Sequence, residues 1–331
     1  MRVFHGGDVW QGHAPEDYLD FSANLNPDGP PAWARAAMAE GLARAAYYPD
    51  LRAGAALAGL SAHLGLPEAC ILPTAGGIEA AALAAKLPGP HAVAQPTFQE
   101  YGRLCGAHRD IDRAALAEYV PAPGENLWLC NPNNPTGDAL PREALSDLLA
   151  RMEAAGGRLV VDEAFIHYCP ARGVAAWAAD RPALVVLGSL TKVLAVPGIR
   201  LGYLVAHPDV LRPLADALPP WRLNCVADAL AAALPGREES FAEIRARNAS
   251  RRASFAAALA ALGARVHPSE ANFLLCDFGR DMGPVIEALR ARRILLRPCH
   301  MFPGLTNRCV RLCVRTEAEN ARLVEALKAS L

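Results

Sequence analysis

Lysine is scarce in this sequence of 331 residues, although arginine is common. Lys86, Lys192 and Lys328 are the three lysines among 33 basic residues. A reaction that needs a primary amine therefore has few candidates in this chain, and the sequence around each lysine becomes informative.

Other features that are absent exclude whole classes of protein. The formal charge is −1, so no strong field attracts nucleic acid or an anionic membrane. No apolar run of about 18 residues occurs, and the first residues lack an apolar signal core. Nine cysteines include no CxxC pair, which fits neither a disulfide framework nor a zinc site. We therefore expect a cytoplasmic protein without a metal site, in which most cysteines are small buried hydrophobic residues.

The length and the order of sequence patterns predict two domains. Residues 1–33 are rich in Gly, Pro, Asp and Asn and predict an extended arm. Residues 34–237 alternate strand-like apolar runs with helical stretches, which predicts an α/β domain with a mostly parallel central sheet. Residues 238–331 begin with a long helical pattern and predict an interdomain helix followed by a smaller α+β domain.

One lysine follows a strand-like run directly. The segment SLTKVLAVPGIRLGY, residues 189–203, places Lys192 in a turn after the apolar run 183–187. Strand ends carry the sites of α/β proteins. An amine that forms a Schiff base must be desolvated or lie near another cation, and Arg200 could supply that charge. The alternative is an ordinary solvated lysine at the start of a helix.

Three further motifs also follow predicted strands. TAGGIEAA at 74–81 is a glycine turn that could hold a phosphate on backbone amides, or merely connect a strand to a helix. NPNNPTG at 131–137 offers the amide of Asn134, although a proline-rich turn would look the same. In RLVVDEAF at 158–165 a predicted buried strand ends in Asp162, which could pair with a buried cation or cap a helix.

In this order, the motifs resemble those of fold-type I pyridoxal-phosphate (PLP) enzymes of the aspartate aminotransferase superfamily, over almost the whole chain. The resemblance implies that Lys192 carries the cofactor as a Schiff base and that Asp162 pairs with its pyridine nitrogen. The other cofactor contacts that it implies are the ring hydroxyl for Asn134, the ring face for Phe98, the phosphate for Gly76, Gly77, Ser189 and Arg200, and the partner subunit's phosphate for Tyr48. A homodimer is implied by that last contact.

The substrate side is also predicted by resemblance. Arg311, in CVRLCVRT, resembles the superfamily's arginine for the substrate α-carboxylate, a task that suits its forked guanidinium. The arm motif HGGDVW…LDFSANLNP, the residue Phe165 and the segment LLRPCHMFPGL resemble threonine-phosphate decarboxylases of cobalamin biosynthesis.

These enzymes convert L-threonine O-3-phosphate to (R)-1-amino-2-propanol O-2-phosphate and carbon dioxide. For the substrate phosphate of this small phosphorylated amino acid, the resemblance favours His5 and Arg297, with Asn24 as a further candidate. Exposed or turn-capping roles are the alternatives for these residues. Histidinol-phosphate aminotransferases are the competing family, and they usually carry Tyr where this chain has Phe165.

Overall fold

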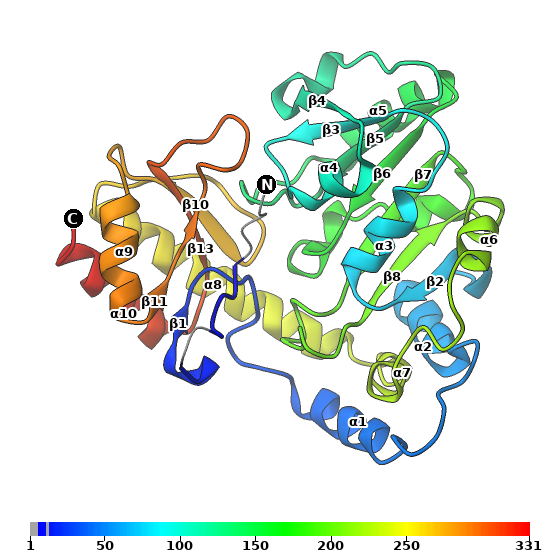
Figure 1. Ribbon diagram of the computed structural model, residues 1–331, viewed down its shortest axis with the longest axis horizontal. Helices are drawn as coiled ribbons and strands as arrows, with labels where there is room; N and C mark the ends of the chain where they lie inside the picture. Colours follow the sequence, from blue (N-terminus) through cyan, green and yellow to red (C-terminus); the bar gives the residue numbers. More distant parts are fainter. Residues whose placement is uncertain (1–5, 11–12) are drawn as a thin grey trace.

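The chain forms two lobes, each with its own hydrophobic core (Figure 1). The computed structural model describes residues 6–10 and 13–331. The larger lobe contains a seven-stranded sheet, and the smaller lobe contains a four-stranded antiparallel sheet. This arrangement confirms the predicted α/β fold class.

The large sheet is mostly parallel. Its strand order is β2-β8-β7-β6-β5-β3-β4, and β8 runs antiparallel to both of its neighbours. The strands are β2 Ile71–Thr74, β3 His91–Gln95, β4 Arg109–Asp112, β5 Asn126–Cys130, β6 Arg158–Asp162, β7 Leu184–Ser189 and β8 Gly202–Ala206. β5, β6 and β7 are apolar and almost wholly buried, as expected for parallel strands covered on both faces. Their carboxyl ends meet at one edge of the sheet.

Most helices of the larger lobe pack on this sheet, and the others pack on neighbouring helices (Figure 1). They are α1 Ala32–Leu42, α2 Gly54–Leu64, α3 Gly77–Ala84, α4 Glu100–Cys105, α5 Arg142–Ala154, α6 Pro208–Asp216 and α7 Cys225–Ala232. Gly59 in α2 touches the backbone of α7 so closely that an added Cβ would lie 2.1 Å from the Ala231 carbonyl oxygen. Small side chains therefore allow these two helices to approach each other.

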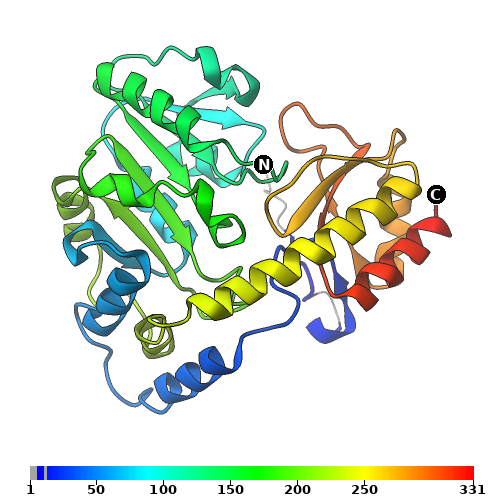
Figure 2. The ribbon, with the colours of Figure 1, turned by 180° about the vertical axis from the view of Figure 1, so that it is seen from behind.

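The smaller lobe is tied to the larger one by a long helix, α8 Glu238–Ala261, which crosses the back of both lobes (Figure 2). Gly263, with φ of 85°, follows its end in the left-handed conformation that favours glycine. The remaining elements are β9 Arg265–Val266, β10 Phe273–Asp277, α9 Gly283–Ala291, β11 Ile294–Leu295, β12 Arg297–Pro298, β13 Cys309–Cys313 and α10 Glu317–Lys328.

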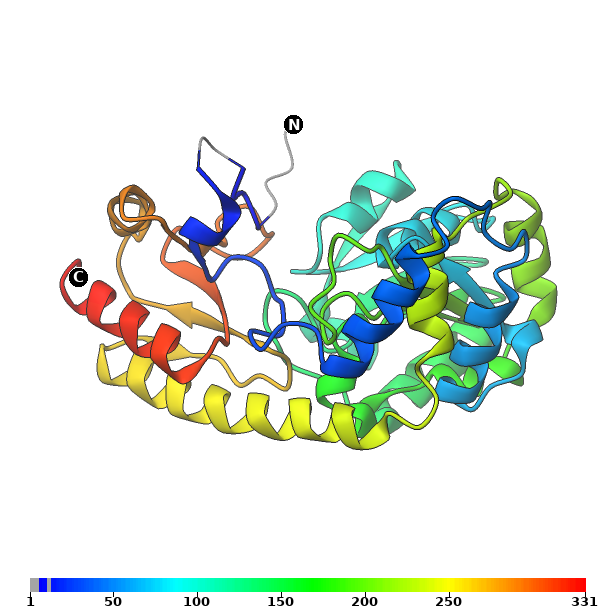
Figure 3. The same cartoon turned by 90° about the horizontal axis from the view of Figure 1, so that it is seen from below.

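The predicted arm is partly built into the smaller lobe. Strand β1, Leu19–Asp20, pairs in parallel with β11, and Leu19 and Phe21 are buried in the smaller lobe's core. The chain then passes between the lobes, where Asn26 N–H donates to the Lys192 carbonyl at 3.0 Å (Figure 3). We propose domain limits at residues 33 and 237. The arm contributes Leu19 and Phe21 to the core of the smaller lobe.

The nine cysteines are all free thiols and seven of them are buried. This agrees with their predicted role as small buried hydrophobic residues. Across residues 6–10 and 13–331, no helix is both long and apolar enough to cross a membrane.

Candidate active site

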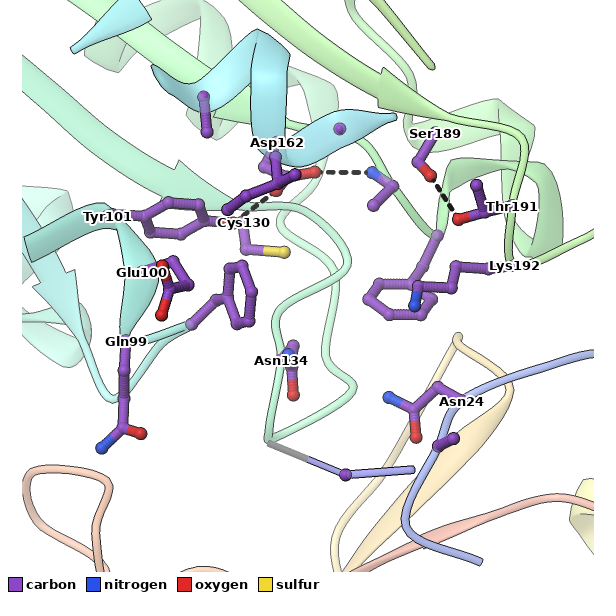
Figure 4. Close-up of a pocket in the computed structure, with 18 of the residues that line it drawn as sticks. Asn24, Gln99, Glu100, Tyr101, Cys130, Asn134, Asp162, Ser189, Thr191 and Lys192 are labelled. Atoms are coloured by element: carbon purple, nitrogen blue, oxygen red, sulfur yellow. Dashed lines mark hydrogen bonds between the residues drawn. The ribbon is translucent and has the colours of Figure 1, made fainter. Parts of the chain in front are cut away.

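A cavity of about 420 Å³ lies where the strand ends of the large sheet face the smaller lobe and the arm (Figure 4). Ten of the predicted site residues line it: Asn24, Gly77, Phe98, Asn134, Asp162, Ser189, Lys192, Arg200, Arg297 and Arg311. Motifs far apart in the sequence thus converge on one cavity.

Lys192 projects into this cavity from the turn that follows β7. Burial, followed by the positive charges of Arg311 and Arg200, lowers the pKa of its amine to about 8. A substantial neutral fraction near pH 7 to 8 makes this amine a competent nucleophile and proton carrier.

Asp162 lies at the carboxyl end of β6, beside the end of β5. Its Oδ1 accepts the Ala164 N–H at 2.8 Å, and its Oδ2 accepts the Tyr101 hydroxyl at 2.6 Å. Burial raises the pKa of the carboxyl group, whereas these two donors and Lys192 lower it. A cationic ring nitrogen would complete the environment of this carboxylate.

The end of the cavity beside Gly77 and Arg200 has groups that suit an anion. Gly76, with φ of 85°, caps α3, and a Cβ there would lie 2.4 Å from Arg200 Nη2. Gly77 opens the helix, so its N–H has no acceptor within the helix and can donate to an anion. Ser189 Oγ and Thr191 Oγ1 are 2.8 Å apart beside them. Gly76 does not line the cavity itself but allows Arg200 to approach.

Asn134 is oriented by Arg311. The guanidinium Nη1 donates to Asn134 Oδ1 at 2.6 Å, and Nη2 donates to the Ser22 carbonyl. Because the amide oxygen is used in this way, the Nδ2 group is left as a donor. This orientation suits a contact to a phenolate oxygen.

Two arginines face each other on the smaller lobe's sheet. Arg297 on β12 is directly opposite Arg311 on β13, and both are buried. Like charges at such a position destabilise a sheet, so the pair is best explained by anionic ligands. Arg311 Nε has no hydrogen-bond partner within the described part of the chain, and burial lowers the pKa of this guanidinium to about 10.

Three of the predicted residues have different environments. Asn24 is buried, and in residues 6–10 and 13–331 its Oδ1 finds no donor. Phe165 packs edge-on against Phe273 at 5.0 Å and lines the cavity. Tyr48 is 82% exposed and lies outside the cavity lining. His5 lies outside the described residues.

Sequence reasoning missed several residues of the cavity. Tyr101 and Thr191 contact predicted site residues, and Gln99 Nε2 donates to the Met301 carbonyl at 2.5 Å, joining the two lobes. Thr191 and Gln99 are neighbours of predicted residues along the chain, and Tyr101 follows Phe98 by three residues. That spacing was the available signal for Tyr101.

PLP fits this set of groups. The cavity offers an anion cradle at Gly77, Ser189 and Arg200, an aromatic side chain at Phe98, a buried carboxylate and a lysine with a lowered pKa. The fold and these groups define a PLP-dependent enzyme with the aminotransferase fold.

The sequence matches the family Aminotransferase class I and II over residues 16–327, and the chain belongs to this family. It is 33% identical to the threonine-phosphate decarboxylase of Salmonella typhimurium, across 98% of this chain and 95% of that protein. It is 35% identical to the histidinol-phosphate aminotransferase of Symbiobacterium thermophilum, across 95% and 91%. The crystal structure of L-threonine-O-3-phosphate decarboxylase from Porphyromonas gingivalis superposes with a TM-score of 0.84 at 25% identity, over 93% of this chain and 98% of that one. Membership of the family confirms the predicted cofactor, pyridoxal 5′-phosphate.

Proposed function

We propose that this enzyme decarboxylates L-threonine O-3-phosphate to (R)-1-amino-2-propanol O-2-phosphate and carbon dioxide. The observation that carries the proposal is the cross-strand pair Arg297 and Arg311 at the substrate end of the cavity. A third arginine, Arg200, lies at the other end, beside the glycine cradle. One arginine for the cofactor and two for the substrate match a substrate with two anionic groups, a carboxylate and a phosphate.

The cofactor, when bound, supplies an electron sink for the bond that breaks at the substrate Cα. Lys192 holds the cofactor and can deliver a proton to Cα, because its lowered pKa leaves both protonation states populated near neutral pH. Asp162 would pair with the ring nitrogen, and Asn134 would donate to the ring oxygen. Arg311 would bind the α-carboxylate and thereby decide which bond to Cα is aligned for cleavage.

The substrate phosphate is assigned to Arg297 and Asn24, with His5 as a third contributor from the arm. Arg297 is 4% exposed, and its guanidinium lies 5.4 Å from the centre of the Phe302 ring. A buried arginine beside an aromatic ring binds a phosphate more strongly than an exposed one, because less water competes. This placement supports recognition of a phosphorylated substrate.

Histidinol-phosphate transamination is the second candidate, favoured by the 35% identity to an enzyme of that name. Against it stands Phe165, which cannot offer the hydroxyl that those enzymes usually present to the ring oxygen. Both candidates use a phosphorylated amine, so the reaction itself must separate them.

The decisive experiment measures carbon dioxide release from L-threonine O-3-phosphate by the PLP-loaded enzyme without any keto acid, with unphosphorylated threonine as the control. We expect release from the phosphate ester alone. Turnover of histidinol phosphate that requires 2-oxoglutarate, without carbon dioxide release, would assign the aminotransferase instead.

The proposal includes a homodimer in which Tyr48 reaches the partner's cofactor phosphate. Mixing Lys192→Ala and Tyr48→Ala subunits should regenerate one intact site per mixed dimer, or about a quarter of the wild-type activity. No recovery on mixing would contradict a shared site. A place in cobalamin biosynthesis and a cytoplasmic location also belong to this proposal.

A further inference from the structure

Tyr101 lies between the predicted stacking ring and the predicted partner of the cofactor nitrogen. It is 1% exposed. Its ring packs edge-on against Phe98 with centroids 5.5 Å apart and lies tilted against Trp128, also at 5.5 Å. Trp128 is itself anchored, because its Nε1–H donates to His91 Nδ1 at 3.0 Å. These contacts hold the phenol in one orientation.

The Tyr101 phenol donates to one oxygen of Asp162, and one backbone amide donates to the other (Figure 4). Tyr101 Oη donates to Oδ2 at 2.6 Å, a length typical of a hydroxyl on an ionised carboxylate. Each carboxylate oxygen can accept more than one hydrogen bond, so Asp162 keeps acceptor capacity for a donor in the cavity. Two donors of fixed direction therefore orient the carboxylate without saturating it.

The same contact acts on the charge of Asp162. Burial raises the pKa of the carboxyl group, and the Tyr101 hydroxyl is the largest influence that lowers it. The pKa of the Tyr101 phenol lies well above its ordinary value, first because of burial and then because of the charge of Asp162. The proton therefore stays on the phenol, and the negative charge stays on Asp162.

We propose that Tyr101 is a positioning residue that keeps Asp162 ionised and oriented toward the pyridine nitrogen of the cofactor. This inference rests on the proposed role of Asp162. Without the hydroxyl, the carboxylate becomes a stronger base, and the proton shared with the ring nitrogen moves to the carboxylate oxygen. The ring would then lose the positive charge that makes it an electron sink.

The test uses Tyr101→Phe, which keeps the ring and removes only the hydroxyl. The readouts are the ¹⁵N chemical shift of ¹⁵N-labelled PLP bound to the protein and the dissociation constant of PLP from the apoprotein. We expect the shift to move toward that of a neutral pyridine and the affinity to fall about tenfold, equivalent to about 1.4 kcal/mol.

A matched control exists in the same lobe. The buried Tyr119 also donates its hydroxyl to a buried carboxylate, that of Glu125, and neither residue lines the cavity. Tyr119→Phe should lower the melting temperature without moving the ¹⁵N shift or the PLP affinity. A purely structural role for Tyr101 would give the same result as this control, and that outcome would overturn the proposal.

A second experiment measures the effect of Tyr101→Phe in another background, so its result does not depend on how well the single variant folds. In an Asp162→Asn background the buried charge is gone, so Tyr101→Phe should change PLP affinity less than twofold there. A further tenfold loss in that background would show that Tyr101 does not act through Asp162. If Asp162→Asn itself leaves the ¹⁵N shift unchanged, the assignment of Asp162 fails; if only Tyr101→Phe leaves it unchanged, Tyr101 alone is wrongly assigned.

Discussion

The two ends of the cavity are built in different ways. The cofactor end is formed by strand ends and short turns of one sheet. The carboxyl ends of β6 and β7 carry Asp162 and Ser189, and Lys192 follows three residues after the end of β7. The end that we propose binds the substrate joins three separate segments, with Asn24 from the arm, Arg297 from β12 and Arg311 from β13. The cofactor end thus serves chemistry common to a family, whereas the substrate end can vary to select a substrate.

The largest effect is expected at the cofactor end. Lys192→Ala removes the proposed attachment point and proton carrier together, so activity should fall by about 10³-fold or more. The visible absorption that PLP gives when attached to a protein lysine should vanish on reconstitution. Lys86, an exposed lysine, supplies the control, because Lys86→Ala should leave both readouts unchanged. Persistence of the absorption in Lys192→Ala would refute the assignment.

A variant of Arg311 should affect substrate turnover much more than cofactor binding. Arg311→Ala removes a buried cation that we propose binds the substrate carboxylate, so kcat/KM should fall by about 10²–10³-fold. PLP affinity should change far less, by roughly threefold, through the lost support of Asn134 Oδ1. Substrate kinetics and a PLP titration check this prediction, and equal losses in both would contradict it.

The pH dependence of PLP attachment should report on the cofactor end of the cavity and not on the substrate end. The pKa of Lys192 is lowered to about 8, so its neutral form falls about tenfold for each pH unit below 8 and is nearly complete above it. The initial rate of PLP attachment to the apoprotein should therefore rise between pH 6 and 8 and then level off. A plateau that is reached only near the pKa of an ordinary exposed lysine would contradict the effect of burial.

Arg297 should affect only the phosphorylated substrate. Arg297→Met keeps an unbranched side chain and removes the charge, so KM for L-threonine O-3-phosphate should rise about tenfold or more. The residual rate with unphosphorylated threonine should not change. If both substrates lose activity in parallel, Arg297 supports the fold rather than the phosphate.

The smallest effect is expected at Phe165, which lines the cavity. Phe165→Tyr adds a hydroxyl to a side chain packed against Phe273, and we expect roughly a few-fold change in rate. Product analysis should still show carbon dioxide and no keto acid, since the orientation set by Arg311 is unchanged. A switch to transamination would give Phe165 the decisive role.

The difference between the two ends also explains what could be predicted from the sequence. Asp162, Lys192 and Gly76 occur in motifs next to apolar runs. Because parallel strands have their carboxyl ends at the same edge of a sheet, these short motifs were sufficient to predict the cofactor end of the cavity. Tyr101 was missed because its contact with Asp162 depends on how α4 packs against the sheet. The arm was predicted to be extended, but its pairing with β11 has no local signal in the sequence.

The sequence by itself determined the α/β class, the cofactor motifs and the candidates for the substrate groups, because these depend on periodicity and on short segments of fixed geometry. Only the tertiary structure decided that Arg297 and Arg311 are cross-strand partners, that Arg311 orients the amide of Asn134, and that Tyr101 supports Asp162. Such contacts join residues 14 to 177 positions apart, as in Arg297 to Arg311 and Asn134 to Arg311, and packing and burial fix them rather than neighbours along the chain.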